Sequence, residues 1–386
     1  MVGVDVYAGP VNICLLIGQL SYGGAERQVV NLAKSVNRDC FSVNVCVLSP
    51  LLDLALELEK ASIPVRVIRK DGRYDLSVVP RLARFFKDEK IRLVHTFLYS
   101  ANVVGALAAV IARIPVVISE RSAPPSLGFE KRVMYRLLGR LSDAIVANSQ
   151  AGKRLLVEQG GIPSEKVWVH YNGVDLSKFE AILDDIETLR GRYAIPKDRF
   201  VVGTVGRLIR VKNHELVLRA AARMREIDPR VHFVVVGDVG PGEDSSYRDY
   251  LFSLQKSLGL EDVVTFTGML SDVGAFLRLF DLFVLTSLWE GTPNALLEAM
   301  ACGLPIVATN VGDVGRIVAD AGCGLIVDPE PEAFSEAISY LLSNEKIRAK
   351  MGIAGRRYIR ANFSLERLAA KTQELWQGLL SKRFKL

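Results

Sequence analysis

Glu290 and Glu298 stand on either side of a predicted helix start. An apolar stretch at 282–286 predicts a strand directly before them, and a helix is expected over 293–302. Glu290 then lies in the loop before the helix, and Glu298 lies about one and a half turns inside it. Free N–H groups at a helix N-terminus can hold a phosphate, while the two carboxylates can accept hydrogen bonds from hydroxyls. The segment suits a ligand with central phosphates and a hydroxyl-bearing group at each end; the alternative is two solvated glutamates on a surface helix.

Residues that favour helix caps mark both ends of this helix. Thr292 is expected as the N-cap and Pro293 as the first helical residue, because the fixed φ of proline suits that position. Gly303 and Pro305 give the stop signal.

Two cations follow another predicted strand, at 200–205. Arg207 comes directly after Gly206, Lys212 follows in the same loop, and Arg210 lies between them and could replace either. An arginine fork and a lysine point charge at the carboxyl end of a strand suit a diphosphate. The alternative is that these cations are simply solvated.

A glycine-rich loop at 18–27 follows the first predicted strand. Gly23 and Gly24 let the backbone approach an anionic ligand closely at the start of a helix. A plain strand–helix turn is the alternative. The spacing is not G-x-G-x-x-G, and no such match occurs elsewhere in the chain, which disfavours a nicotinamide enzyme.

The chain alternates short β-rich apolar stretches with amphipathic helical stretches, and the pattern starts again in its second half. This alternation predicts parallel sheets with crossover helices, and therefore two doubly wound α/β units in tandem. The expected strands lie at 12–17, 42–48, 64–68, 93–96, 115–119 and 144–147, then at 200–205, 232–236, 263–267, 282–286, 306–309 and 324–327. The expected helices lie at 25–35, 51–61, 77–89, 130–141, 214–227 and 247–258. A charge-rich linker is expected at 179–196, and the ligand is expected beyond the carboxyl ends of the strands.

Composition favours a folded protein of two domains. The chain has 386 residues, 24% of them charged, and its five cysteines include no C-x-x-C pair, which disfavours a disulfide framework or a zinc ribbon. The N-terminus lacks the basic start of a signal peptide. The apolar stretch at 103–112 is about half the ~20 residues that span a bilayer. These features predict a cytoplasmic protein with reduced thiols.

The net charge of +6 lies entirely in the first 180 residues. Such asymmetry fits an anionic partner such as a membrane surface, or a soluble surface with no special partner. The segment at 130–141, EKRVMYRLLGRL, predicts a basic amphipathic helix. This helix can lie on anionic lipid, or it can pack its apolar side on the domain core.

Taken together, these residues resemble the retaining glycosyltransferases of family 4, which have the GT-B fold. The resemblance covers nearly the whole chain, and its most specific part is EGTPNALLEAMACGLPIVAT at 290–309. The pieces GGAERQVVNLA, VGRLIRVKN, HYNGVDLSKF and FDLFVLTSLWE also look like family signatures, in the family's order. The resemblance implies two Rossmann-like domains facing a cleft. Residues 1–185 would bind the acceptor, residues 186–362 the nucleotide sugar, and a helix at 363–386 would pack back on the first domain.

The resemblance also assigns roles to residues of this chain. Arg207 and Lys212 would bind the donor diphosphate and stabilise the leaving group. Glu290 would contact the transferred sugar and Glu298 the ribose, while the loop at 267–270 would contact the nucleobase. The other expected donor-binding residues are Gly23, Gly24, Gly206, Gly268, Met269, Gly291, Thr292, Asn294 and Ala295.

One residue departs from the family pattern. Arg121, in the loop after the strand at 115–119, takes the place where many members carry a histidine. Arginine stays protonated and cannot act as a base, but it could bind a phosphate or an acceptor anion. His95 is expected at another loop, either as a substrate contact or as a packed or solvated histidine. No D-x-D motif and no His/Cys cluster with metal spacing occurs, so the prediction is a reaction that needs no metal and no cofactor.

The sequence therefore predicts a retaining hexosyltransferase. It would move a hexose or N-acetylhexosamine from a UDP- or GDP-sugar to an acceptor hydroxyl, in surface polysaccharide or lipid-linked glycan assembly. Its expected partners are the donor, a glycan or lipid-linked acceptor, and an anionic membrane touched peripherally at the inner face of the cell membrane, with no nucleic acid. The alternatives are an epimerase-type enzyme acting on nucleotide sugars and a non-catalytic nucleotide-sugar-binding subunit.

Overall fold

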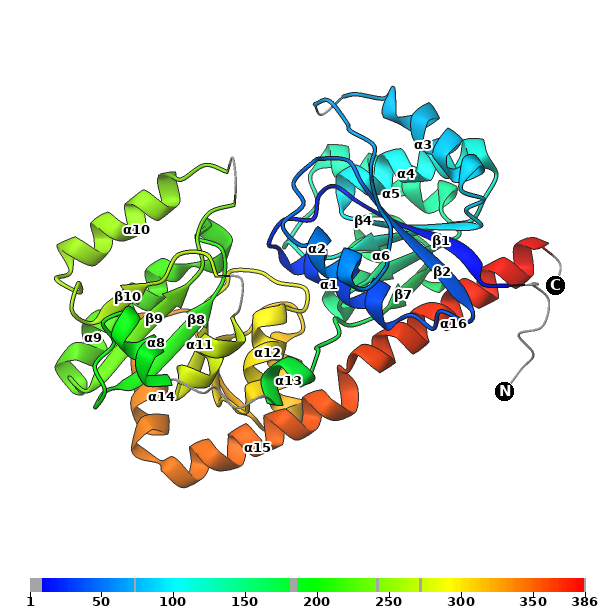
Figure 1. Ribbon diagram of the computed structural model, residues 1–386. Coiled ribbons are helices and arrows are strands. Elements are labelled where there is room, and N and C mark those ends of the chain that lie inside the picture. The colour runs from blue at the N-terminus through cyan, green and yellow to red at the C-terminus, as the bar shows by residue number, and fades with distance from the viewer. Residues whose placement is uncertain (1–8, 73, 181–185, 241–242, 271–272, 385–386) are drawn as a thin grey trace. The chain divides into compact units, whose positions relative to one another are not determined.

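The computed structural model describes residues 9–72, 74–180, 186–240, 243–270 and 273–384 (Figure 1). The chain forms two compact units, one of Met1–Gly173 with Leu365–Leu386 and one of Val174–Ser364. Each unit has one parallel β-sheet, as the alternating pattern predicts. The boundary expected at residue 185 lies outside the described residues.

The first unit contains a seven-stranded sheet in the order β3-β2-β1-β4-β5-β6-β7. Successive side chains of β1 enter two separate cores, Ile13 and Leu15 on one face and Cys14 and Leu16 on the other, as expected for a sheet buried on both sides. The strands are β1 (Val11–Ile17), β2 (Phe41–Val47), β3 (Val65–Val67), β4 (Leu93–Phe97), β5 (Val116–Glu120), β6 (Ala144–Ala147) and β7 (Val167–Val169). Strand β7, at the edge of the sheet, is not among the strands expected from the sequence.

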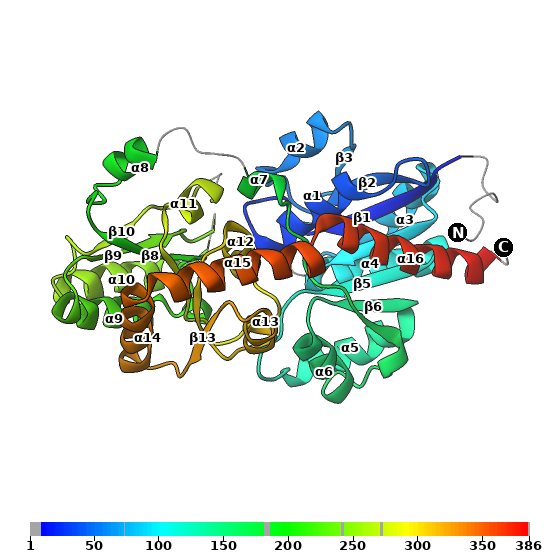
Figure 2. The ribbon, with the colours of Figure 1, turned by 90° about the horizontal axis from the view of Figure 1, so that it is seen from below.

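Helices cover both faces of this sheet, with α1 and α2 on one side and α5 and α6 on the other (Figure 2). The helices of the first unit are α1 (Gly24–Ser35), α2 (Ala55–Lys60), α3 (Val78–Asp88), α4 (Tyr99–Ala112), α5 (Phe129–Leu141), α6 (Gln150–Glu158) and α16 (Leu365–Phe384), with a 3-10 turn η1 (Ser164–Lys166). Helix α4 contains the apolar stretch at 103–112. No helix in the described part of the chain combines the length and apolarity needed to cross a bilayer.

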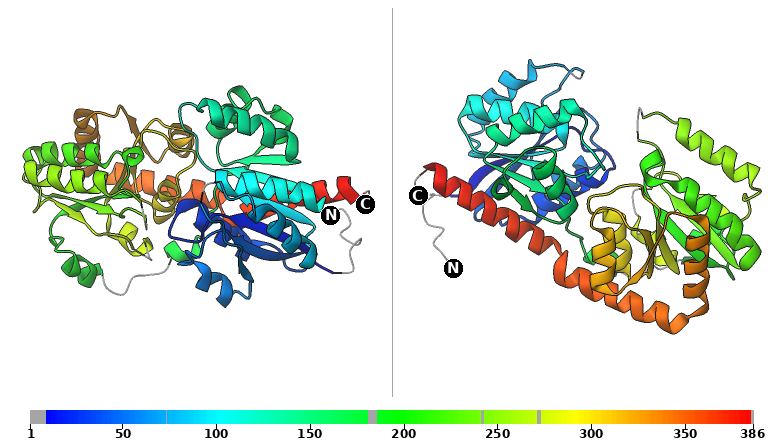
Figure 3. Two further views of the ribbon diagram at one scale, coloured as in Figure 1. Left: turned by 90° about the horizontal axis from the view of Figure 1, so that it is seen from above. Right: turned by 180° about the vertical axis from the view of Figure 1, so that it is seen from behind.

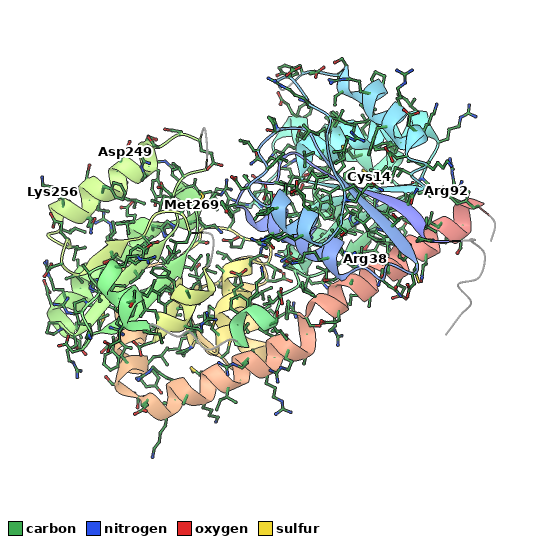
Figure 4. All side chains as sticks on the ribbon, in the orientation of Figure 1. Cys14, Arg38, Arg92, Asp249, Lys256 and Met269 are labelled. Carbon is green, nitrogen blue, oxygen red and sulfur yellow. The ribbon has the colours of Figure 1, made fainter. Side chains whose placement is uncertain are left out.

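The C-terminal helix α16 completes the core of the first unit (Figure 3). Its Trp376 is fully buried, and the indole ring packs edge-on against Phe41 at 5.5 Å between ring centroids. At the far end of α16, the Arg92 guanidinium lies 3.9 Å from the centroid of the Phe384 ring, a cation–π contact (Figure 4). These contacts confirm the prediction that the last helix packs back on the first domain.

The second unit contains a six-stranded parallel sheet in the order β10-β9-β8-β11-β12-β13. Its strands are β8 (Phe200–Val205), β9 (Val231–Val236), β10 (Val264–Phe266), β11 (Leu282–Leu285), β12 (Ile306–Thr309) and β13 (Gly324–Val327). Its helices are α7 (Ser177–Glu180), α8 (Ile186–Arg192), α9 (His214–Ile227), α10 (Ser246–Ser257), α11 (Gly274–Leu279), α12 (Asn294–Cys302), α13 (Val314–Ala321), α14 (Pro331–Ser343) and α15 (Glu345–Asn362), with a 3-10 turn η2 (Arg210–Lys212).

All four histidines of the chain, His95, His170, His214 and His232, are buried. Burial lowers the pKa of His170, His214 and His232 from 6.5 to about 4 and lowers the pKa of His95 well below 6.5. Between these values the unfolded chain binds more protons than the folded one, so stability is lost as pH falls from 6.5 towards 4. We expect the urea midpoint of unfolding to fall steeply from pH 6.5 to 5 and to change little between pH 7 and 8. A midpoint that stays constant from pH 6.5 to 5 would contradict this pH dependence.

Candidate active site

The order of the second sheet brings the predicted donor-site residues together. Strands β9 and β10 lie on one side of β8 and strand β11 on the other, so the direction of winding changes between β8 and β11. In open parallel sheets, ligands bind beyond the carboxyl ends of the strands at this point. The loop after β8 carries Arg207 and Lys212, and the loop after β11 carries Glu290.

Lys212 and Glu290 form an ion pair where these two loops meet. The Ser287 hydroxyl donates to the same Glu290 oxygen, at 2.8 Å. The loop backbones are joined as well: the Thr286 hydroxyl donates to the Lys212 carbonyl at 2.9 Å, and the Leu288 N–H donates to the Val211 carbonyl at 2.8 Å. The Lys212 and Glu290 side chains are 22% and 12% exposed, which leaves each a small accessible surface for a ligand.

Helix α12 presents one accessible face beside this pair. Asn294, Ala295 and Glu298 are half-buried there, whereas Leu296 and Leu297 are buried. Asn294 and Glu298 are four residues apart and therefore lie one above the other on the helix surface. Glu298 has polar interactions within the chain in this structure.

Helix α12 begins one residue later than the sequence predicts. Pro293 is the N-cap, with an extended backbone at ψ 129°, and Asn294 is the first helical residue. The predicted N-cap, Thr292, is buried in the preceding loop. The end is as predicted: the helix stops at Cys302, and Gly303 adopts the left-handed conformation at φ 79°.

Gly312 packs closely against the backbone of the Glu290 loop. The sequence does not identify it as a site residue. A Cβ at this position would lie 2.2 Å from the Glu290 carbonyl oxygen and 2.7 Å from that of Gly291. Its φ of +54° also excludes most side chains. The neighbouring Asp313 N–H donates to the Gly291 carbonyl at 3.2 Å. No sequence signal identifies such a glycine, because its partner is more than twenty positions away.

The loops after β8, β9 and β10 approach one another closely. Gly206 lies in the first of these loops and Gly268 in the third. A Cβ on Gly237 would lie 2.1 Å from the Gly206 carbonyl oxygen, and the Gly237 N–H donates to the Gly268 carbonyl at 3.0 Å. Met269 follows Gly268 in the loop after β10 (Figure 4). The predicted glycines thus bring backbone segments of this chain together, and Gly237 is a third member that the sequence analysis missed.

In the first unit, Gly23 and Gly24 lie where a helix begins, as predicted. Gly23 is the N-cap of α1 and Gly24 its first residue. A Cβ at Gly23 would lie 2.2 Å from a carboxylate oxygen of Glu26, so a larger residue there would require the Glu26 side chain to move.

His95 does not lie in a loop, and that expectation is wrong. It is a buried residue within β4, whose ring bonds the Ser119 hydroxyl through Nε2 at 2.8 Å. Its Nδ1 accepts from the Trp376 indole N–H at 3.2 Å. Burial, aided by the nearby His170 and Arg121, lowers the pKa of His95, so it is a neutral, packed histidine.

Arg121 follows β5 at the carboxyl edge of the first sheet. Its Nη2 donates to Asn172 Oδ1 at 2.6 Å, and its buried Nε has no hydrogen-bond partner among the described residues. A cavity of about 10 Å³ lies beside it, lined also by His95, Ser119 and His170. Burial lowers the pKa of Arg121 to about 10, while Glu120 acts in the opposite direction. Arg121 therefore remains a cation at neutral pH.

The two parallel-sheet units, and the acid–cation pair at the winding reversal of the second, match the arrangement that the resemblance to family 4 glycosyltransferases implies. The chain matches the model of Glycosyltransferase Family 4 over residues 22–178 and that of Glycosyl transferases group 1 over residues 185–358. It belongs to glycosyltransferase family 4 and has the GT-B fold.

Individual relatives agree with this assignment. The D-inositol 3-phosphate glycosyltransferase of Salinispora arenicola is 30% identical over 307 residues, covering 74% of this chain and 68% of that protein. The UDP-Gal:alpha-D-GlcNAc-diphosphoundecaprenol alpha-1,3-galactosyltransferase of Escherichia coli is 26% identical over 312 residues, covering 78% of this chain and 79% of the relative. The crystal structure of Anabaena HepE in complex with UDP-glucose superposes with a TM-score of 0.84 at 26% identity, covering 95% of this chain and 99% of that one. The chain is therefore a glycosyltransferase.

Proposed function

We propose that this enzyme transfers a hexose or N-acetylhexosamine from a UDP-sugar to an acceptor hydroxyl, with retention of the anomeric configuration. The observation that carries the proposal is the Lys212–Glu290 pair, held beside the start of α12 where the winding of the second sheet reverses. The choice of UDP over GDP is supported by HepE, solved with UDP-glucose, and by the Escherichia coli relative, named for UDP-Gal.

The proposed role of each site residue follows from the charge of its side chain. Arg207, Lys212 and the N-terminal N–H groups of α12 bind the diphosphate, because each offers positive charge or N–H donors to an anion. Glu290 accepts hydrogen bonds from hydroxyls of the transferred sugar, and Glu298 from the ribose. Gly268 and Met269 border the nucleobase.

In the proposed reaction, the acceptor hydroxyl attacks the anomeric carbon on the face from which the diphosphate departs. The bond from the anomeric carbon to the phosphate oxygen breaks, the bond to the acceptor oxygen forms, and the acceptor proton passes to the departing diphosphate. This route needs no nucleophile from the protein. Lys212 and Arg207 stabilise the charge that develops on the leaving oxygen.

The acceptor is proposed to carry phosphate and to be linked to lipid. The names of both relatives include a phosphate-bearing acceptor, which is D-inositol 3-phosphate in one and GlcNAc-diphosphoundecaprenol in the other. In this chain Arg121 is a half-buried cation whose buried Nε has no hydrogen-bond partner in the described structure, which suits it to such an anion. A lipid-linked acceptor would place the enzyme peripherally at the inner face of the cell membrane.

The reaction is proposed to proceed without a metal ion, since Arg207, Lys212 and the helix N-terminus supply the positive charge that the diphosphate requires. Calorimetric titration with UDP and with GDP, each with and without EDTA, tests both the nucleotide and the metal. We expect UDP to bind more tightly than GDP and EDTA to leave its affinity unchanged. Tighter binding of GDP would overturn the donor assignment, and loss of UDP binding in EDTA would overturn metal independence.

Glu243 is expected to compete with the donor for Arg207. Its carboxylate pairs with the Arg207 guanidinium and also accepts the Gly240 N–H at 2.9 Å. Removing its charge in Glu243→Gln frees Arg207, so UDP affinity should rise, by up to about fivefold for an ion pair this exposed. The matched control is Glu187→Gln, which breaks a surface pair with Lys197 and should leave affinity unchanged. Calorimetry measures both; weaker UDP binding in Glu243→Gln would show that Glu243 assists the donor.

A further inference from the structure

His214 is a buried histidine that contacts the backbone of the loop carrying Arg207 and Lys212. It is the first residue of α9 and is 1% exposed. Its Nε2 lies 3.1 Å from the carbonyl oxygen of Arg207, seven positions earlier in the chain. Because a carbonyl oxygen only accepts, Nε2 carries the ring proton and donates it. The His214 side chain therefore ties the start of this loop to the helix that follows it.

The His214 ring is uncharged at neutral pH. Burial lowers its pKa from 6.5 to about 4, the Arg207 carbonyl acts in the opposite direction, and the nearby Lys212 cation lowers the pKa further. The buried Nδ1 has no hydrogen-bond partner among the described residues. The bond from Nε2 to the Arg207 carbonyl is therefore the polar contact that a substitution of His214 must replace.

Other hydrogen bonds join the same loop to neighbouring loops of the second unit. At its end, the Lys212 carbonyl accepts from the Thr286 hydroxyl at 2.9 Å. Nearer its start, the Leu208 N–H donates to the Asp238 carbonyl at 3.1 Å. These bonds connect the loop to the segments after β11 and β9. His214 adds the connection to α9, so the loop is held from several directions.

The His214 ring also lies close to the side chain of Lys212. A Cβ built on Gly206 would be 3.4 Å from Lys212 Cγ and 3.7 Å from His214 Cε1. The lysine stem and the histidine ring thus flank the same side of Gly206. The position of the ring bears on both cations, on Arg207 through a hydrogen bond and on Lys212 through packing.

We propose that His214 is a positioning residue of the donor site, which fixes the backbone from which Arg207 and Lys212 reach the diphosphate. The ring itself does not touch the substrate. A site of this kind works when supporting residues hold its side chains in place, and a displacement of about 1 Å can cost about 100-fold in rate. The role of the two cations rests on the proposed function, whereas the effect of His214 on the loop backbone does not.

Two substitutions separate positioning from simple filling of space. His214→Gln keeps an N–H donor near the place of Nε2, whereas His214→Leu keeps an apolar side chain and has no donor. We expect His214→Leu to weaken UDP binding about tenfold, the equivalent of one hydrogen bond. We expect it to lower kcat/KM by about 100-fold, and His214→Gln to retain most of both. A space-filling role predicts the opposite order, because a buried leucine costs less than a buried unpaired amide.

His232 provides the matched control within the same unit. It is buried, its Nε2 lies 2.9 Å from the Thr265 hydroxyl oxygen, and its buried Nδ1 has no hydrogen-bond partner among the described residues. It stands near the amino end of β9, whereas the donor-site loops follow the carboxyl ends of the strands. His232→Leu should therefore leave UDP affinity and kcat/KM unchanged, even where it lowers the urea midpoint of unfolding as much as His214→Leu does.

Amide hydrogen exchange of residues 206–213 gives a readout that does not depend on activity. We expect these amides to exchange faster in His214→Leu than in wild type, in His214→Gln or in His232→Leu, because the loop has lost one of its connections. Unchanged exchange and UDP affinity in His214→Leu would overturn the proposal, as would a leucine variant that binds UDP more tightly than the glutamine variant. Faster exchange in His214→Leu, in a protein whose wild type releases no nucleoside diphosphate from any donor, would uphold the fixing of the loop and refute the proposed function.

Discussion

Glu290→Gln is expected to lower kcat by about 100-fold or more, with a much smaller effect on the affinity for UDP. The substitution keeps the shape of the side chain but removes the charge that pairs with Lys212 and that accepts hydrogen bonds from sugar hydroxyls. Removing one preorganised polar group that stabilises a transition state costs about 100- to 1,000-fold in kcat. Release of nucleoside diphosphate under saturating donor measures kcat, and calorimetry measures UDP affinity.

The control for this variant is Glu57→Gln, which removes a comparable ion pair with Arg27 in the first unit. It should retain wild-type turnover. Equal turnover of Glu290→Gln and wild type would refute the role of Glu290. A loss confined to UDP affinity would instead place Glu290 on the nucleotide.

Lys212→Met is expected to lower kcat/KM by about 1,000-fold, because it removes a cation from the leaving diphosphate and leaves Glu290 unpaired. The Lys212 side chain is 22% exposed and Glu290 12%, so water can only partly replace the lost partner. UDP affinity should fall together with kcat, in contrast to Glu290→Gln. Steady-state kinetics over a range of donor concentrations separates the two effects.

Two further variants make the Lys212 result specific. Lys197→Met, which breaks an exposed pair with Glu187, should change nothing. The double variant Lys212→Met with Glu290→Gln should be less impaired than the two single effects multiplied, because the residues act as a pair. Fully multiplicative losses would show that the pair does not act as a unit.

The sequence alone predicts most of the architecture, and it nominates the residues of the candidate site. The alternation of strands and helices predicts both sheets, because a short β-rich apolar stretch followed by an amphipathic helical one is a local property. The segment from Glu290 to Glu298 is identified by a preceding strand, helix-capping residues and the spacing of the two acids, all between residues 282 and 305. Arg207 and Lys212 are predictable for the same reason, since both follow a clear strand.

The errors and omissions have physical reasons. His95 was expected in a loop although the expected strand at 93–96 already contains it, and its hydrogen bonds to Ser119 and Trp376 come from distant segments. Gly237 and Gly312 are constrained by backbone contacts across separate loops, which leave no local signature. The helical period of α5 could not show which of its apolar residues face the core, because both sides of the helix are apolar.

The sequence also does not show which charged side chains form ion pairs with each other. Lys212 and Arg207 have the same expected role, yet one pairs with Glu290 and the other with Glu243. The first pair is largely buried and joins two loops of the site, whereas the second is about half exposed. Lys212 is therefore expected to be the more costly of the two cations to remove.

The most direct measurement of the central claim follows one reaction by ¹H NMR. Wild type and Glu290→Gln are incubated with each of a panel of UDP- and GDP-sugars and with GlcNAc-diphosphoundecaprenol in detergent. The proposal predicts that one UDP-sugar gives UDP and glycosylated acceptor in equal amounts, that the product keeps the anomeric configuration of the donor, and that Glu290→Gln is at least about 100-fold slower. A product of inverted configuration, or a donor converted to its epimer without release of nucleoside diphosphate, would contradict it.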